Sequence, residues 1–482
     1  MALALPATRL VRVSNIESTR TEAATKTPNL VVLATCALVG VLSLVAQTPA
    51  AQAAPRDAEL PSIDVESYSL SNGLTVLLSR GQRLPVVAVE VRYLVGSAHE
   101  RPGRSGFAHL FEHLMFQGSR SYDDEYFKPF EPIGAIVNGS TNTDRTNYYE
   151  RVPSSYLELA LWMESDRMEG LLDALTQEKL DNQRDVVKNE RRQRYENSPY
   201  GMVWKHLANA LHPPGHPYHH TTIGSHEDLS AATLDDVKEF FATYYVPSNA
   251  VLTIVGDFEP SEAKALVDRY FGHLPAGQRA SMPVPPRLVQ RGAHIIDPDN
   301  VQLPRIHLAW NTPALFADGD AALDVLAGVL STGKTSRLSQ SLVYEQKVAK
   351  DVVAYQVSRA LGSFFVVQAT AAPGVSVDVL SQALQAQLAA ALDKPPSADE
   401  MARVVNQWRK SFYEQIEGVL SRAQLLSTYY AMTGDPDYIA EDLARYTTLT
   451  AADVHHHAKR WLDLERAVRI DMVPAGQQGT TR

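Results

Sequence analysis

Residues 106 to 118 read Gly106-Phe107-Ala108-His109-Leu110-Phe111-Glu112-His113-Leu114-Met115-Phe116-Gln117-Gly118. Apolar residues fill this run, which favours a helix packed against a core. Ser105 is a candidate N-cap, and Gly118 is a residue type that commonly ends helices. The stretch therefore predicts a short helix that begins at about Ser105.

The predicted helix places two imidazoles on one face. His109 and His113 are four residues apart, one helical turn, so both can bind one Zn²⁺. Glu112 projects toward the same side and can act on a water at such a site. The order of the three residues, H-x-x-E-H, is the reverse of the H-E-x-x-H motif. The alternative is an amphipathic helix with two incidental histidines. The apolar surroundings favour the metal site, because two imidazoles and a carboxylate among Phe, Leu and Met need a partner.

The N-terminal region has the features of an export signal. Basic residues precede the apolar run 30–46, and Ala51 and Ala53 follow it in the small-residue positions of a cleavage site. The alternative is a membrane anchor, but a run of about 17 residues is short for a span. We expect residues 1–53 to be a signal peptide, and the protein to be exported, to the periplasm, with no stable membrane span after cleavage.

Charge and cysteine content exclude several classes of function. The net charge is −10, and residues 1–53 hold four basic and two acidic residues, so cleavage would leave −12. This charge argues against nucleic acids and anionic membrane surfaces as partners.

The only cysteine, Cys36, lies in the apolar run. The mature chain would therefore have no disulfide, no cysteine nucleophile and no thiolate ligand.

The length of 482 residues predicts two or more domains. Residues 276–292 contain Pro283, Pro285 and Pro286 and are a candidate linker. It separates an N-terminal domain, 54–275, from a C-terminal domain, 293–482. A helix opening at Thr233 and a strand near 250–255 are echoed 217 residues later by a helix opening at Thr450 and a strand near 467–473. This echo favours a duplication, with two α+β domains.

The second half repeats the framework without the candidate ligands. Counting forward from the strand-like segments 87–95 and 306–310 places Asp324, Ala327 and Gly328 where the first half has His109, Glu112 and His113. None of these residues is a histidine, so we expect the metal site only in the N-terminal domain.

Several motifs resemble one known family. Gly96-Ser97 with Glu100, the motif from His109 to His113, and Gly118 resemble the pitrilysin, insulinase and mitochondrial-processing-peptidase family of inverted-motif zinc metallopeptidases, over about 67–474. The resemblance implies an α+β fold of two tandem duplicated domains, each a mainly antiparallel sheet packed with helices. It also implies one Zn²⁺ per chain. The family's third ligand is a Glu 77 residues after the second His, and here that position is Glu190.

The resemblance also implies supporting and substrate-binding residues. Gln183 stands where the family tends to have another Glu; its amide can orient a ligand but adds no charge. Asn138, Gly139 and Ser140 open a polar stretch that resembles the family's edge strand, to which a peptide substrate adds as one more strand. Phe116 could line an apolar subsite or belong to the core.

One departure from the family concerns the second half. Members with a complete site often carry an Arg and a Tyr seven residues apart, which hold the substrate backbone. Val343 and Lys350 occupy those positions here. The departure predicts a homologous partner subunit that carries the pair, or a homodimer that binds its substrate by other contacts.

The resulting hypothesis is a zinc-dependent metalloendopeptidase that cleaves peptides or unfolded polypeptide segments in the cell envelope, with Glu112 as the general base. The alternative is a non-catalytic structural or assembly subunit of the same fold. A third class, nucleotide binding, is suggested by the P-loop spacing in 328–335, but that segment follows a helical run, whereas a P-loop follows a strand.

Overall fold

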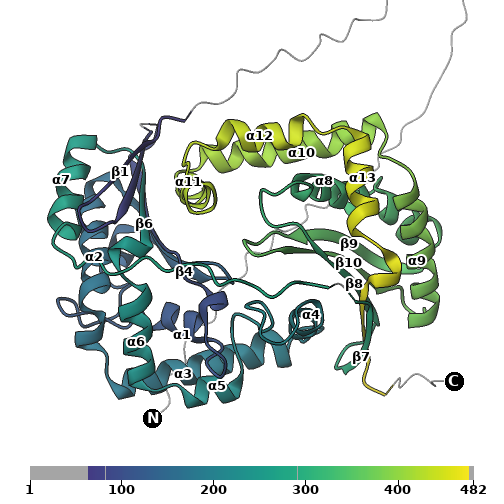
Figure 1. The fold of residues 1–482 in the computed structure, drawn as a ribbon, viewed down its shortest axis with the longest axis horizontal. Coiled ribbons are helices and arrows are strands. Elements are labelled where there is room, and N and C mark those ends of the chain that lie inside the picture. The colour runs from purple at the N-terminus through teal and green to yellow at the C-terminus, as the bar shows by residue number, and fades with distance from the viewer. Residues whose placement is uncertain (1–62, 82, 290, 477–482) are drawn as a thin grey trace, which may run out of the picture. The chain divides into compact units, whose positions relative to one another are not determined.

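The computed structural model describes residues 63–81, 83–289 and 291–476. All of them belong to one compact unit (Figure 1). The predicted signal peptide with Cys36 lies outside the described residues, as do the last six residues of the predicted C-terminal domain. Within the described part, no helix is long and apolar enough to cross a membrane.

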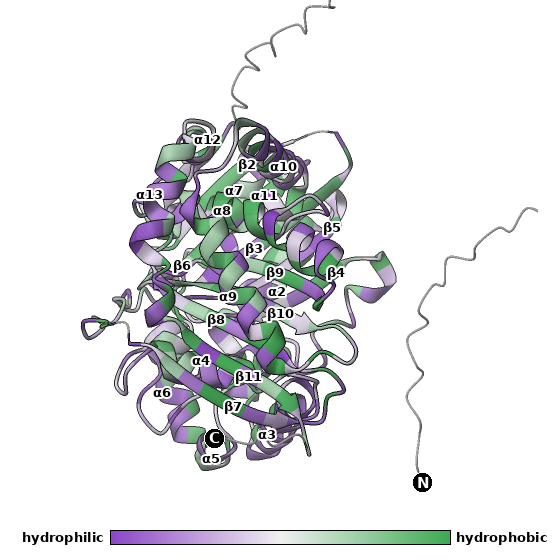
Figure 2. Cartoon of the chain, turned by 90° about the vertical axis from the view of Figure 1, so that its right-hand side faces the viewer, coloured by the Kyte–Doolittle hydropathy of each residue, from purple (hydrophilic) through white to green (hydrophobic). Residues whose placement is uncertain are grey.

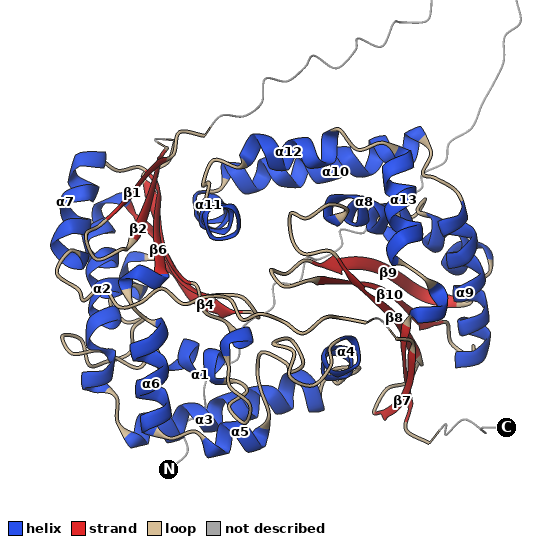
Figure 3. Cartoon of the chain, in the orientation of Figure 1, coloured by secondary structure: helices blue, strands red, loops and turns tan. Residues whose placement is uncertain are grey.

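The first half is built on a six-stranded sheet in the order β1-β2-β6-β3-β5-β4. Figure 3 shows strands of this sheet in red, with β1, β2, β6 and β4 labelled. Neighbouring strands are antiparallel except for β2 and β6, which are parallel. The strands are β1 (Glu66–Ser69), β2 (Thr75–Arg80), β3 (Val86–Tyr93), β4 (Ile136–Thr141), β5 (Thr146–Pro153) and β6 (Ala250–Gly256).

The second half is built on a five-stranded sheet in the order β7-β11-β8-β10-β9. Here β7 and β11 are parallel, and the other neighbours are antiparallel. The strands are β7 (Ala293–Asp299), β8 (Arg305–Thr312), β9 (Ala349–Val357), β10 (Ser363–Ala371) and β11 (Val468–Pro474). Apart from the additional β1, the second sheet repeats the order and the strand directions of the first, so the predicted fold of two duplicated, mainly antiparallel domains is confirmed.

Helices fill the connections in both halves. In the first half they are α1 (Phe107–Leu114), α2 (Leu157–Ala174), α3 (Gln177–Arg191), α4 (Val203–Leu211), α5 (His226–Ala231), α6 (Leu234–Tyr244) and α7 (Pro260–Phe271). In the second half they are α8 (Asp320–Ser331), α9 (Val377–Asp393), α10 (Ala398–Glu417), α11 (Val419–Thr433), α12 (Ile439–Thr447) and α13 (Ala451–Trp461).

The two segments that echo each other in the sequence occupy equivalent places. Thr233 and Asp236 form a capping box at the start of α6, and Thr450 and Asp453 form one at the start of α13. Each helix leads into a strand, β6 or β11, that lies next to a parallel neighbour on one side and an antiparallel one on the other. The described residues of the predicted linker, 276–292, form neither helix nor strand. The domain limits themselves stay a prediction.

Each half contributes one helix to the sheet of the other. Helix α11 packs on β3 and β6, where its Leu426 joins a core cluster with Val251 and Val255. Helix α4 packs on β8 and β11, where Leu207 lies in one cluster with Ile470. In Figure 2 much of the β11 ribbon is green, the colour of hydrophobic residues. The opposite faces of the two sheets lie against core clusters that each half forms mainly with its own helices.

A buried polar network strengthens the contact between the halves. Arg92 on β3 donates from Nε to the hydroxyl of Ser427 at 2.9 Å and from Nη2 to that of Thr428 at 2.8 Å. Ser427 in turn donates to Glu90 at 2.7 Å. Buried polar groups that find partners in this way fix how two surfaces fit together.

Candidate metal centre and active site

Helix α1 carries the motif, but it begins differently from the prediction. Its N-cap is Gly106, whose φ of 90° lies in the left-handed region, and no side chain caps the helix from that position. Ser105, the predicted cap, instead hydrogen-bonds Asp228 and accepts the backbone N–H of Ser225. The helix ends at Leu114, and Gly118 follows after a further turn, with a φ of 96°.

The free N–H groups at the start of α1 are bound by Glu100. Its Oε2 accepts the N–H of Gly106 at 2.9 Å and its Oε1 accepts that of Ala108 at 2.8 Å. The carboxyl group is fully buried. Glu100 therefore replaces the missing N-cap side chain, and it fixes the helix immediately before His109.

Glu100→Ala should lower the free energy of unfolding by about 2–3 kcal/mol, because it leaves two buried N–H groups without acceptors. Chemical denaturation of the zinc-loaded protein measures the effect, with the exposed Glu125→Ala as a control. Equal stability of the two variants would contradict the capping role.

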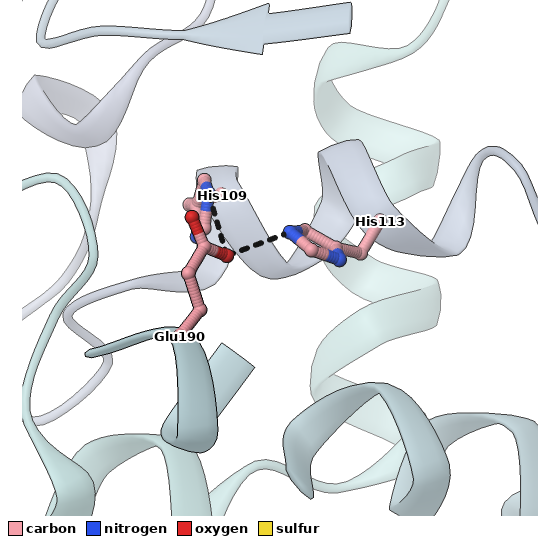
Figure 4. Close-up of side chains that lie close together, drawn as sticks. All are labelled: His109, His113 and Glu190. Carbon is pink, nitrogen blue, oxygen red and sulfur yellow. Dashed lines mark ion pairs between the residues drawn. The ribbon is translucent and has the colours of Figure 1, made fainter. Parts of the chain in front are cut away.

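The structure brings His109, His113 and Glu190 together (Figure 4). Glu190 lies near the end of α3, which packs against α1. Its Oε2 is 3.2 Å from Nε2 of His113 and 3.7 Å from Nε2 of His109. In the part of the chain that the structure describes, no other group of three or more His, Cys, Asp or Glu side chains converges in this way.

This cluster fits a zinc ion in donor chemistry, spacing and protonation. Two nitrogens and a carboxylate oxygen are ligands that Zn²⁺ takes, and ligand bonds of about 2.0–2.1 Å in a tetrahedron place the donor atoms about 3.3 Å apart. The observed separations of 3.2 and 3.7 Å are close to that value. Burial lowers the pKa of His109 to about 4, so its imidazole is neutral, as a metal ligand must be.

Glu112 faces the same cleft. Burial raises its pKa, and a hydrogen bond with Thr141 and the charge of His113 oppose this. Its Oε2 is buried and makes no hydrogen bond to any described residue. A buried carboxylate oxygen without a partner is costly, so its position is consistent with a group that meets a water or a substrate atom.

The cleft has a volume of about 740 Å³ and is bordered by β4. It is lined by the residues of the cluster, Glu112, Phe116, Gln117, Phe127, 138–142, Gln183, Arg194, Tyr195, Thr222 and Ile223. Strand β4 pairs only with β5, so its other edge is free among the described strands. The predicted Asn138, Gly139 and Ser140 lie on this edge strand.

Gly139 allows β4 to approach α1 closely. A Cβ atom at this position would lie 3.2 Å from Cγ of Glu112 and 3.2 Å from Cε2 of Phe116. The neighbouring side chains hold the strand: Asn138 accepts the N–H of Gly139 at 2.8 Å, and Ser140 donates to Asn147 at 2.7 Å. A larger residue at 139 would require these side chains or the strand to shift by a few tenths of an ångström.

Phe116 and Gln183 lie at the margins of the cleft. Phe116 is half-buried; it lines the cleft and also packs against the core, with its ring stacked on Phe127 at 4.8 Å. Gln183 is buried and donates to Asn182 at 3.2 Å, and it makes no hydrogen bond to His109, His113 or Glu190. Its role in supporting the ligands stays a prediction.

The sequence reasoning missed Arg194, which lies in the π-helical turn η4 (Arg192–Glu196) directly after α3. Its Nη1 is 2.7 Å from Oε1 of Glu190, so it orients the carboxylate and leaves Oε2 toward the imidazoles. The burial of Glu190 raises its pKa, but the hydrogen bond from His113 and electrostatic attraction, including that of Arg194, lower it overall. The spacing of Glu and Arg at i and i+4 could have indicated this pair.

The remaining sequence candidates lie elsewhere. Val343 is in the π-helical turn η6 (Ser339–Glu345) and Lys350 is exposed on β9; neither lines the cleft. Gly328 lies in the last part of α8, so the P-loop-like segment does follow a helix.

The second half has no ligands at the positions equivalent to the motif. Helix α8 begins after Gly319, whose φ of 93° matches that of Gly106. Alignment of these two caps pairs His109, Glu112 and His113 with the buried Ala322, Val325 and Leu326. Counting from the strands led instead to Asp324, Ala327 and Gly328, because the loops before the two helices differ in length.

Sequence and structure comparisons agree with this geometry. A sequence model described as insulinase, peptidase family M16, matches residues 75–216, and one described as the peptidase M16 inactive domain matches 231–408. The zinc protease PqqE of Helicobacter pylori is 30% identical over 419 residues, which cover 85% of this chain and 93% of the relative. The probable mitochondrial-processing peptidase subunit beta of Schizosaccharomyces pombe is 25% identical over 312 residues, 61% of this chain and 66% of the relative.

A solved structure of a protease from Helicobacter pylori superimposes with a TM-score of 0.80 at 27% identity, and the match covers 86% of this chain and all of that one. The periplasmic protease PqqL of Escherichia coli has the same fold, with a TM-score of 0.71 at 19% identity over 88% of this chain and 49% of that chain. Fold and motif together define the class of inverted-motif zinc metallopeptidases. Within that class, the chain belongs to the insulinase family, peptidase family M16.

At the level of the family, these names support a metallopeptidase-like function and imply zinc as the metal. The predicted family and fold are therefore confirmed. The roles of the individual site residues stay predictions. The description of the second matching model as an inactive domain agrees with the absence of ligands from α8.

Proposed function

We propose that this protein is a zinc-dependent metalloendopeptidase that hydrolyses peptides or unfolded polypeptide segments. The observation that carries the proposal is the convergence of His109, His113 and Glu190 with the unpartnered oxygen of Glu112 in one cleft. The first three side chains would hold one Zn²⁺, and Glu112 is the catalytic residue.

The chemistry that a bound Zn²⁺ supplies is Lewis-acid activation of water and of the scissile carbonyl. Glu112 takes the proton of the attacking water on its free Oε2 and passes it to the leaving amine. Its burial brings the pKa of the carboxyl group closer to the working pH, which suits a group that first accepts and then donates a proton.

The free edge of β4 binds the substrate. An extended peptide that adds beside Asn138, Gly139 and Ser140 makes main-chain hydrogen bonds that do not depend on its sequence. Phe116 and the adjacent Phe127 form an apolar wall for one substrate side chain. An edge of this kind accepts only extended segments, which is why we propose peptides or unfolded polypeptides as substrates.

We propose that the protein acts in the cell envelope, in the periplasm. The basic and apolar N-terminal segment supports export, and the Escherichia coli protein of the same fold is described as periplasmic.

The proposed activity is tested by incubating the purified, zinc-loaded chain with unstructured polypeptides and short quenched-fluorescence peptides. Zinc-dependent hydrolysis is expected. The alternative, a non-catalytic structural or assembly subunit, predicts no hydrolysis with or without a partner chain, even when one zinc per chain is present.

The isolated chain should be weakly active, and a homologous partner should raise its turnover. Val343 and Lys350 replace the Arg and Tyr that orient the substrate backbone, and positioning contributes strongly to catalysis. Measurement of mass and turnover before and after mixing the two chains decides the question. Full activity in a verified homomer, unchanged by the partner, would contradict the two-subunit arrangement and favour a homodimer.

A further inference from the structure

A loop of the second half docks beside the cleft of the first half. It connects β9 and β10, and its backbone N–H groups at Ala360 and Leu361 donate to Asp144 and to the hydroxyl of Tyr218, each at 3.0 Å. Tyr218 also donates to the other carboxylate oxygen of Asp144. Both oxygens of Asp144 are therefore bound, and the loop is held in place by several hydrogen bonds.

The same loop carries Arg359, whose guanidinium has no polar partner among the described residues. It lies over the rings of Tyr218, at 5.2 Å, and Phe364, at 4.6 Å. Among the described residues, it makes no side-chain hydrogen bond and no ion pair. Burial lowers its pKa despite the attraction of Tyr218 and Asp144. Ring contacts offset part of the cost of burying a cation, and the remaining cost favours an anionic partner.

Arg359 lines a small pocket that adjoins the proposed active-site cleft. The pocket has a volume of about 90 Å³, and its other polar lining includes Thr143, Tyr195, His220 and Thr222. Tyr195 and Thr222 also line the main cleft. The hydroxyl of Tyr195, like the guanidinium, makes no hydrogen bond to another described residue. The pocket thus presents a cation and a free hydroxyl next to the metal cluster.

We infer that this pocket is a subsite for a carboxylate group of the peptide substrate, and that Arg359 is the residue that selects it. The inference rests on the proposed peptidase function. A guanidinium binds a carboxylate through two parallel hydrogen bonds, which is a strong and directional interaction. A volume of about 90 Å³ accommodates roughly three waters, which is enough for a carboxymethyl group.

The described side chains of the main cleft do not favour a carboxylate. Glu112 and Glu190 repel anions, and Arg194 already binds Glu190. A bound Zn²⁺ would attract a carboxylate as well, so the part of the preference that Arg359 supplies is the part that disappears when Arg359 is replaced. The group could be an acidic side chain or the C-terminal carboxylate of a short peptide, and the two sources are separated by the experiment.

The experiment measures peptide binding to the zinc-loaded full-length Glu112→Gln protein, which is expected not to cleave. Fluorescent peptides carry Asp or Asn at successive positions, and a second series has a free or an amidated C-terminus. In one series the carboxylate form should bind about 10-fold more tightly than its neutral counterpart, as charge-assisted hydrogen bonds allow. A preference for Asp at one position identifies a side-chain subsite, and a preference for the free acid identifies a terminal one.

Adding Arg359→Gln to this protein should reduce the ratio of the affinities for the carboxylate and neutral peptides to about 1. Arg359→Lys should keep part of this preference, since the charge remains without the two parallel donors. The matched control is Arg460→Gln, because Arg460 is exposed on α13 and also stacks on an aromatic ring, Trp461, at 5.2 Å. It should leave the ratio unchanged.

The variant Arg359→Met distinguishes the loss of the positive charge from a loss of folding. Arg359→Met keeps an apolar stem over the two rings, so it should retain the parent's melting temperature and its affinity for neutral peptides while losing the carboxylate preference. No carboxylate preference in the parent, or a preference that survives both neutral substitutions, would overturn the inference. The binding comparison uses the Glu112→Gln protein and does not depend on peptide hydrolysis. A failure of the proposed function would therefore appear in a different measurement, as the absence of peptide hydrolysis by the wild-type protein.

Discussion

Glu112→Gln is expected to abolish peptide cleavage while the protein retains its zinc. The substitution keeps the size of the side chain but removes the proton acceptor, and loss of a general base costs about 10²–10⁴ in rate. The measurement is kcat on a quenched-fluorescence peptide together with the zinc content of the same sample. Glu112 is separate from the three side chains that converge, so one zinc per chain should remain.

A matched control for this variant is Glu178→Gln, which makes the same chemical change at an exposed position on α3. It should retain wild-type turnover. Hydrolysis by Glu112→Gln at the wild-type rate would remove Glu112 from the catalytic role.

The wild-type protein is expected to hold one zinc ion per chain, and His113→Ala and Glu190→Gln should each lose it. Each substitution would remove one of the three proposed protein ligands, and the two residues lie on different helices that pack against each other. Zinc is measured by elemental mass spectrometry after the protein has passed through a desalting column. Activity should fall with the metal content.

Glu178→Gln again serves as the control, because it lies on the same helix as Glu190 and outside the cluster. If both ligand variants retain stoichiometric zinc, the assignment of His113 and Glu190 as ligands is wrong. If only one of them retains it, the ion is held by a different set of donors.

Part of the site was predictable because its residues are neighbours in the sequence. The one-turn spacing of His109 and His113 follows from helix geometry alone, wherever the helix lies in the fold. The polar stretch around Asn138 to Ser140 indicated an edge strand, and β4 is the outer strand of its sheet. Glu190 was identified only through the family resemblance, since no local pattern connects α3 to α1.

Other contributions could not be predicted, because they depend on contacts between distant parts of the chain. Ser105 looked like a helix cap, but Glu100 binds the free N–H groups and Gly106 makes the turn. Arg359 is 246 residues from His113 and reaches the neighbourhood of the cleft only because the β9–β10 loop docks on Asp144 and Tyr218.

The sequence by itself determined the motif helix and the repeated helix-and-strand pattern of two halves, since each follows from local spacing or turn chemistry. The tertiary structure decided which carboxylates meet the histidines, how Arg194 orients Glu190, and which guanidinium lies beside the cleft without an ion pair to a described residue. The physical reason is that hydrogen bonds, ion pairs and burial act over a few ångströms. Only the folded chain brings residues from α1, α3 and the β9–β10 loop within that range.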